Sequence, residues 1–232
     1  MTTNRSEQAV LEHIKTIQEN VQKAADCSGR KREEISIMAV TKTVEPEYVN
    51  LAIEQGITLL GENRVQEFLG KRQEYHLTQA QVHFIGHLQT NKVKSIVDKV
   101  SMIESVSSLK LAQEIDRCAQ KCNLVMPVLL EVNIGNEETK TGFSPEELWE
   151  ILPQMSEISN ISVQGLMCIP PKEDTEKFFE KMNQLFIDIK GKNIDNIHMT
   201  HLSMGMSADY SLAIAYGATI VRLGTALFGR RN

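Results

Sequence analysis

The run ISIMAVTKT at residues 35–43 is a short aliphatic segment that ends in polar residues, and a helical pattern follows it from near Glu47. An aliphatic strand of this kind is typical of a parallel sheet whose outer face is covered by helices. Open doubly wound sheets usually carry a glycine-rich loop after their first strand. This run continues into Thr41, Lys42 and Thr43 without a glycine. It therefore favours a closed barrel, with an open sheet as the alternative.

The alternation of an aliphatic run with a helical segment continues along the chain. Strands are predicted at Ile35–Thr41, Thr58–Leu60, Val82–Ile85, Met102–Glu104, Met126–Val132, Ser162–Cys168, Ile197–Leu202 and Thr219–Leu223. Helices are predicted to begin near Glu47, Asn63, Asn91, Ser108, Pro145, Asp174 and Ala208. This pattern predicts an α/β fold, a (β/α)₈ or TIM barrel. Because no linker divides the chain, we expect residues 1–232 to form a single domain.

An additional N-terminal helix is predicted before the first strand. Apolar residues recur at helical spacing at Val10, Ile14, Ile17 and Val21. Gly29 is expected to end this helix, and Gly217 the one that starts near Ala208. The best marked helix start is Ser144-Pro145, where Glu147 completes a capping box.

The charge balance excludes one class of partner. The 232 residues include 25 Lys and Arg against 30 Asp and Glu, a net charge of −5. Proteins that coat nucleic acid through its phosphates need a basic surplus, so we expect no nucleic-acid partner. No run reaches the roughly 18 apolar residues of a membrane span, and the first residues lack a signal-peptide pattern. We expect a cytoplasmic protein with no membrane partner.

The cysteines are scattered, which is typical of reduced thiols rather than of a disulfide framework. They are Cys27, Cys118, Cys122 and Cys168. Cys118 and Cys122 lie four residues apart in a helical segment, where we expect packing rather than metal ligation. No metal site is predicted.

Lys42 is the first candidate for chemistry. In a (β/α)₈ barrel, the residues that follow the C-terminal ends of the strands converge on one mouth, where the active site is built. Lys42 follows the first predicted strand at that mouth. A lysine at the edge of an apolar strand is partly desolvated, which favours the neutral amine that attacks carbonyl groups.

Two loops at the same mouth indicate an anion. The segment LSMGMSAD at 202–209 places two hydroxyls and a glycine before a helix, and RLGTALFG at 222–229 begins with an arginine and a turn of small residues. Loops after strands 7 and 8 form the usual phosphate-binding corner of such barrels. Strands 1 and 8 become neighbours on closure, so the amine faces an anion cradle. An aldehyde that carries a phosphate would satisfy both.

Six motifs in chain order resemble the pyridoxal phosphate homeostasis protein family. They are AVTKT at 39–43, GENRVQE at 61–67, HFIGHLQTNK at 83–92, GLM at 165–167, LSMGMSAD at 202–209 and VRLGTALFG at 221–229. The resemblance covers almost the whole chain and implies a fold similar to the N-terminal barrel of alanine racemase. Two positions depart from the pattern: Val82 stands where the family often has Trp, and His87 occupies a variable place.

The resemblance also implies a cofactor, pyridoxal 5′-phosphate, and a set of residues that bind it. These are Lys42, which forms the Schiff base, Asn63 and Arg222 beside the pyridine ring, Ser203, Gly224 and Thr225 at the phosphate, and Met204, Gly205 and Ser207 in the adjoining loop. Lys140 resembles a lysine implicated in secondary handling of the cofactor. No residue is assigned a catalytic role.

A carrier is the leading functional hypothesis. An arginine beside the pyridine nitrogen disfavours protonation of that nitrogen and weakens the ring as an electron sink. Racemases with such an arginine use a second acid/base, commonly a tyrosine from a further domain. This chain ends at Asn232, directly after the barrel, and Tyr210 and Tyr216 fall on a predicted outer helix.

We therefore expect a monomer that carries or buffers pyridoxal phosphate, without turnover of its own, and that passes the cofactor to apo-enzymes. Amino-acid and keto-acid balance would be affected indirectly. The first alternative is an amino-acid racemase of low activity. The second is a sugar-phosphate enzyme that uses Lys42 as aldolases use their lysine, although such lysines usually lie on a later strand.

Overall fold

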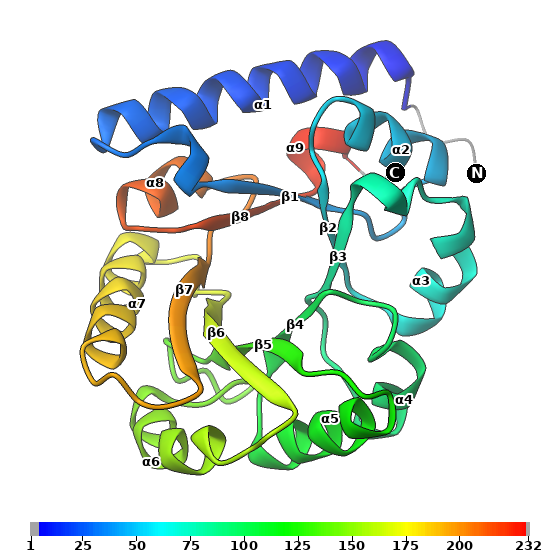
Figure 1. Cartoon of the computed structure of the whole chain (residues 1–232). Coiled ribbons are helices and arrows are strands. Elements are labelled where there is room, and N and C mark those ends of the chain that lie inside the picture. The colour runs from blue at the N-terminus through cyan, green and yellow to red at the C-terminus, as the bar shows by residue number, and fades with distance from the viewer. Residues whose placement is uncertain (1–4, 231–232) are drawn as a thin grey trace.

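A closed barrel of parallel strands forms the centre of the computed structural model, which describes residues 5–230 (Figure 1). The strands are β1 (Ser36–Val40), β2 (Leu59–Glu62), β3 (Gln81–Phe84), β4 (Met102–Val106), β5 (Met126–Val132), β6 (Ile161–Cys168), β7 (Ile197–Ser203) and β8 (Ile220–Leu223). Each strand pairs with the next in the chain, and β8 pairs with β1 to close the barrel. The predicted (β/α)₈ fold is confirmed.

Helices form the outer layer and alternate with the strands (Figure 1). They are α1 (Glu7–Cys27), α2 (Pro46–Glu54), α3 (Val65–Lys71), α4 (Val93–Ile96), α5 (Leu109–Lys121), α6 (Pro145–Ser156), α7 (Thr175–Lys190), α8 (Tyr210–Ala215) and α9 (Thr225–Phe228). Short 3₁₀ turns lie at η1 (Arg32–Glu34), η2 (Arg72–Glu74), η3 (Leu77–Gln79) and η4 (Thr90–Lys92).

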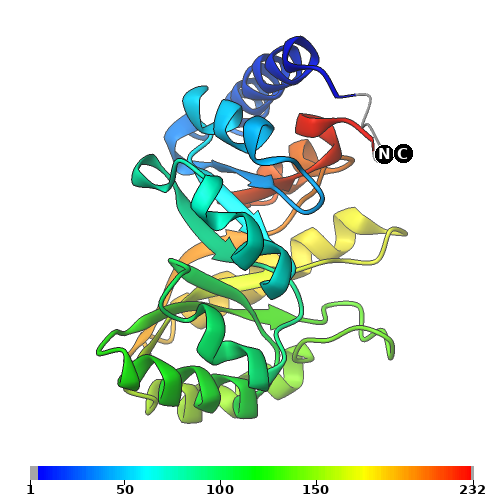
Figure 2. The same ribbon diagram turned by 90° about the vertical axis from the view of Figure 1, so that its right-hand side faces the viewer.

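The N-terminal helix α1 lies across the outside of the barrel, where it packs on α2, α8 and α9 (Figures 1 and 2). Its buried residues are the four of the predicted stripe, Val10, Ile14, Ile17 and Val21, together with Ala25. Just beyond its last turn Gly29 adopts a φ of +64°, a left-handed conformation that suits glycine at a helix end. The predicted end of this helix is confirmed.

The predicted cap of α6 and the predicted end of α8 are also confirmed. The Ser144 hydroxyl accepts a hydrogen bond from the Glu147 N–H at 3.1 Å, and the Glu147 carboxylate accepts one from the Ser144 N–H at 2.8 Å. After α8, Gly217 has a φ of +89°. Both ends follow from local chemistry, because a cap is made by residues within one turn of each other.

Most predicted strands differ from the observed ones by one or two residues at an end, and β4 and β2 each continue two residues further than predicted. β2 was expected to stop at Leu60, but Gly61 and Glu62 continue the ladder against β3. Glycine and glutamate are weak strand formers, so the local sequence does not indicate this extension. The helix expected near Asn91 is broken into η4 and the four-residue α4.

The barrel interior contains two separate apolar groups. One consists of Met38, Val40, Ile85 and Ile220, from β1, β8 and the end of β3. The other consists of Met102, Leu129 and Met167, from β4, β5 and β6. The larger core lies between the strands and the helices.

Within residues 5–230, no helix is both long and apolar enough to cross a bilayer. In the same part of the chain, no group of three or more His, Cys, Asp or Glu side chains is placed to hold a metal ion. The four cysteines are free thiols. Cys118 is buried on α5 and packs in the core, as predicted, whereas Cys122 is exposed just past the end of that helix.

Candidate functional site

Lys42 and the loop after β8 line one small cavity at the mouth of the barrel. Lys42 follows β1, is half-buried, and borders a cavity of about 40 Å³ together with Gly224 and Thr225. The pairing of β1 with β8 brings these segments together, since Met38 of β1 lies opposite Arg222 of β8. The predicted meeting of an amine with the loop after β8 is thus present in the structure.

The loops after β7 and β8 are joined by direct hydrogen bonds. The Ser207 hydroxyl accepts one from the Ala226 N–H at 3.1 Å, and the Gly205 carbonyl accepts one from the Arg222 N–H at 3.0 Å. Gly205 has a φ of +89°, and a Cβ there would lie 2.5 Å from the Ala213 Cβ. Only glycine fits this turn, so the small residues of both motifs serve the close approach of the two loops.

Arg222 is buried in the barrel and is linked to the carboxylate of Glu104 through the hydroxyl of Ser203. Its Nη1 donates to the Ser203 hydroxyl at 2.8 Å, and its Nη2 donates to the Cys168 carbonyl at 2.7 Å. The Ser203 hydroxyl donates in turn to Glu104 Oε2 at 2.6 Å. The carboxylate that a buried guanidinium requires is therefore supplied through Ser203.

Glu104 is the functional candidate that the sequence did not identify. It is fully buried on β4, and its Oε1 lies 2.7 Å from His83 Nδ1 on β3. Burial acts to raise the pKa of Glu104, but hydrogen bonds from His83 and Ser203, with the charges of His83 and Arg222, outweigh it and hold this pKa below its usual range. The available signal was a glutamate within the fully buried strand run MIESV at Met102–Val106.

Asn63 lies at the end of β2 with an unpartnered polar atom. Its Oδ1 is buried and has no hydrogen-bond partner within the described chain. A Cβ added at Gly86 would lie 2.1 Å from the Asn63 carbonyl oxygen, so the glycine allows the two strand ends to pack closely. Buried polar atoms are normally paired. An unpaired amide oxygen at the mouth fits a site that receives a polar ligand.

Lys140 lies apart from this cavity. Its Nζ donates to the Ile169 carbonyl at 3.2 Å and forms an ion pair with Glu137. It borders another cavity, of about 240 Å³, with Glu131 and Asn133 of the β5 end. The structure thus does not bring Lys140 to Lys42.

The two positions that depart from the family motif also have defined places. Val82 is buried in the main core between strands and helices. His87 is exposed and borders a cavity of about 440 Å³, which Asn63 also lines.

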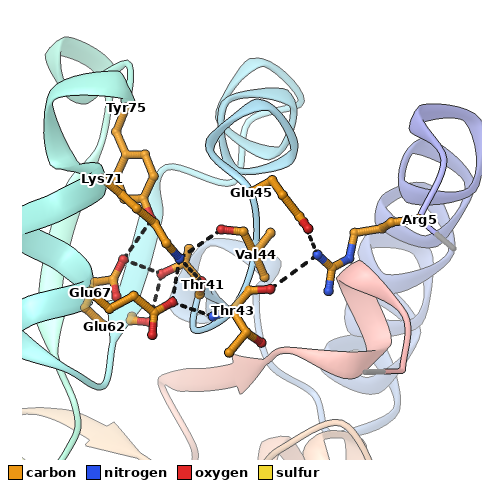
Figure 3. Close-up of polar contacts among 10 residues, drawn as sticks. Arg5, Thr41, Thr43, Val44, Glu45, Glu62, Glu67, Lys71 and Tyr75 are labelled. Atoms are coloured by element: carbon orange, nitrogen blue, oxygen red, sulfur yellow. Dashed lines mark hydrogen bonds and ion pairs between the residues drawn. The ribbon is translucent and has the colours of Figure 1, made fainter. Parts of the chain in front are cut away.

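A clamp from α3 holds the loop that carries Lys42 (Figure 3). Thr43 has a φ of +59°, which is costly for a β-branched residue. Its N–H donates to Glu67 at 2.5 Å, and Lys71 pairs with the same carboxylate while donating to the Val44 carbonyl at 2.9 Å. Burial opposes the charged form of Glu67, but the hydrogen bonds from Lys71 and Thr43 hold its pKa below the usual range.

Arg5 supports the same loop from the other side (Figure 3). Its side chain pairs with Glu45, donates to the Thr43 carbonyl at 3.4 Å, and donates to the Phe228 carbonyl at 2.7 Å. Because Phe228 ends α9, Arg5 ties the loop after β1 to the segment after β8.

A third contact lies beneath this loop. Glu62 is buried at the end of β2, where its Oε1 accepts hydrogen bonds from Thr41 at 2.7 Å and Tyr75 at 2.9 Å (Figure 3). Its Oε2 is buried without a partner in the described chain. Burial is the main reason that the pKa of Glu62 is raised.

Comparison with known proteins adds sequence evidence. Residues 13–232 match the family described as alanine racemase, N-terminal domain. The chain is 44% identical over 225 residues to the pyridoxal phosphate homeostasis protein of Aquifex aeolicus, covering 95% of this chain and 98% of that one. It is 33% identical over 227 residues to the protein of the same name from Escherichia coli K12, covering 96% and 97%.

Solved structures agree with the fold. PipY of Synechococcus elongatus, solved with pyridoxal phosphate bound, is 32% identical, with a TM-score of 0.79 over 90% of this chain and 100% of that one. An alanine racemase of Clostridium difficile is 19% identical, with a TM-score of 0.73 over 95% of this chain and 57% of the racemase. The racemase likeness shows a shared barrel fold.

Proposed function

The chain belongs to the pyridoxal phosphate homeostasis family, with a barrel of the alanine racemase N-terminal type, and we propose that it binds pyridoxal phosphate and carries or buffers it. One observation supports this proposal above the others. Lys42 and the small-residue loop after β8 line the same cavity, in a chain similar to a solved relative with that cofactor bound.

Different residues at the mouth are proposed to bind different groups of the cofactor. When bound, the cofactor supplies an aldehyde that bonds covalently to an amine, and Lys42 is the amine that lines the cavity with the loop after β8. Ser207, Gly224 and Thr225 lie at the joined loops, where Met204 and Gly205 shape the turn that would receive the phosphate.

Asn63 and Arg222 complete this assignment at the ring edge. Asn63 has the unpartnered amide oxygen, and Arg222 presents a guanidinium that is held from within the barrel. Ser203, which the sequence predicted at the phosphate, is left out of this assignment because its hydroxyl contacts Glu104 and Arg222.

The visible spectrum of the protein loaded with pyridoxal phosphate tests the covalent assignment. Borohydride reduction followed by peptide mass analysis is expected to locate the modified residue at Lys42. Lys42→Ala should abolish the visible band because it removes the amine. Lys92→Ala, at a half-buried lysine near the mouth, is the matched control and should retain it. Equal covalent loading of Lys42→Ala would contradict the assignment.

The racemase alternative is disfavoured by the placement of the tyrosines. In residues 5–230, the hydroxyls of Tyr48, Tyr75 and Tyr216 donate to Arg5, Glu62 and Glu176, respectively. Tyr210 is buried in the core between strands and helices. None of these contacts offers a second acid/base opposite Lys42.

Incubation of the loaded protein with single L-amino acids in D₂O separates the two functions. A carrier should show no sustained deuterium incorporation at the α-carbon, whereas a racemase should incorporate deuterium with turnover.

Apo-enzymes that depend on pyridoxal phosphate are the proposed recipients, and a cytoplasmic location fits the free thiols. The monomeric state stays a prediction for sedimentation to check.

A further inference from the structure

A buried chain of hydrogen bonds crosses the barrel interior from β3 to β8. It runs from His83 through Glu104 and Ser203 to Arg222, with heavy-atom distances of 2.7, 2.6 and 2.8 Å. All four side chains are at least nine-tenths buried. Its four residues come from β3, β4, β7 and β8.

The donors and acceptors fix the direction of each hydrogen bond from His83 to Arg222. An ionised carboxylate only accepts hydrogen bonds, so both His83 and Ser203 donate to Glu104. A hydroxyl has one proton, and Ser203 gives it to Glu104. The Ser203 oxygen then accepts from Arg222. Its remaining lone pair cannot bond to an oxygen of a fully ionised phosphate, because that oxygen only accepts hydrogen bonds.

The same chain of hydrogen bonds fixes the position of the Arg222 guanidinium. Its Nη1 is held by Ser203 and its Nη2 by the Cys168 carbonyl, so two nitrogens of the guanidinium are fixed from within the barrel. Arg222 is 4% exposed. Hydrogen bonds to charged groups are stronger and more directional than neutral ones. Loss of the Ser203 link would leave one nitrogen of a buried cation unpaired.

We propose that Ser203 and Glu104 are positioning residues that fix the guanidinium of Arg222, with His83 completing the chain, and that the Ser203 hydroxyl does not bind phosphate. This rests on the proposed function only in placing Arg222 beside the pyridine ring. The contacts themselves belong to the protein without ligand.

The first test uses the protein without cofactor. NMR of the Arg222 side chain reports the rate at which its Nη hydrogens exchange with water, with Arg222→Lys to assign the signals. Ser203→Ala and Glu104→Gln should each raise that rate by about tenfold or more, because each removes a charge-assisted link. Ser105→Ala is the matched control on β4, since that residue is equally buried and its Oγ has no partner in the described chain.

The second test separates a ring effect from a phosphate effect. Dissociation constants are measured for pyridoxal phosphate and for pyridoxal, which lacks the phosphate. Ser203→Ala should weaken both by the same factor, about tenfold, because it acts through Arg222 on the ring. Ser207→Ala should weaken pyridoxal phosphate alone. Glu104→Gln should resemble Ser203→Ala, and urea unfolding confirms that each variant is folded.

The outcomes are distinct. If Ser203→Ala weakens pyridoxal phosphate and leaves pyridoxal unchanged, Ser203 holds the phosphate and the proposal is overturned. Unchanged exchange at Arg222 in both Ser203→Ala and Glu104→Gln also overturns it. If the wild-type protein binds neither compound, the proposed function fails, while the exchange measurement still decides whether Ser203 and Glu104 position Arg222.

Discussion

Gly86 shows how a single residue positions the site. A Cβ there would lie 2.1 Å from the Asn63 carbonyl oxygen and 2.8 Å from its Cα, a contact that requires the backbone to move. Gly86→Ala is expected to cost about 1–3 kcal/mol of stability, as overpacking does, and to weaken cofactor binding by displacing Asn63. Gly70→Ala, in α3 with open space around it, should instead be neutral or add roughly 0.5–1 kcal/mol. Urea unfolding of both variants checks this, and equal stabilities would contradict it.

At the scale of an element, α3 acts on the loop that carries Lys42. Glu67 and Lys71 hold the Thr43 N–H and the neighbouring carbonyls. Glu67→Gln is expected to raise amide exchange at Thr43 by roughly tenfold, because it removes a charged acceptor. Since the pKa of Glu67 is lowered by folding, its stabilisation is present above the ordinary carboxyl range and is lost as pH falls through the folded pKa. The exposed Glu74→Gln is the control; unchanged Thr43 exchange in Glu67→Gln would refute the clamp.

At the scale of the whole molecule, the raised pKa of Glu62 makes the free energy of unfolding depend on pH. Its pKa is raised by burial, so the folded state binds the proton more tightly than the unfolded chain. Stability is therefore lost as pH rises from the ordinary carboxyl range through the folded pKa. Glu62→Gln should be more stable than wild type by about 1–3 kcal/mol at neutral pH, with the advantage vanishing in acid. Thermal unfolding across pH, with the exposed Glu150→Gln as control, measures this; an equal advantage at every pH would show that the carboxyl charge is not responsible.

The main features of the fold follow from patterns along the chain. The stripe of α1, the Ser144 cap and the glycine ends of α1 and α8 each depend on residues within a few positions of one another, and the structure confirms them. Strand ends were harder to predict. β2 gains Gly61 and Glu62 because β1 and β3 supply pairing partners for them, and pairing partners are not visible in a local pattern.

In the candidate site, too, some features could be predicted from the sequence and others could not. Lys42 and the two loops could be predicted, because the ends of parallel strands converge in any barrel. The roles of Ser203 and Glu104 could not, because the two residues lie 99 positions apart in the chain and meet only across the closed barrel. Assignment of residues 1–232 to one domain stays a prediction.

The sequence by itself determined the strand and helix order, the family, and the position of Lys42 at the mouth, since periodicity, caps and motifs are local properties. Only the tertiary structure decided which groups face the barrel interior and how they share their protons. The physical reason is that a hydroxyl has one proton to donate and a buried charge needs a partner. Both requirements are met by residues brought together when the barrel closes.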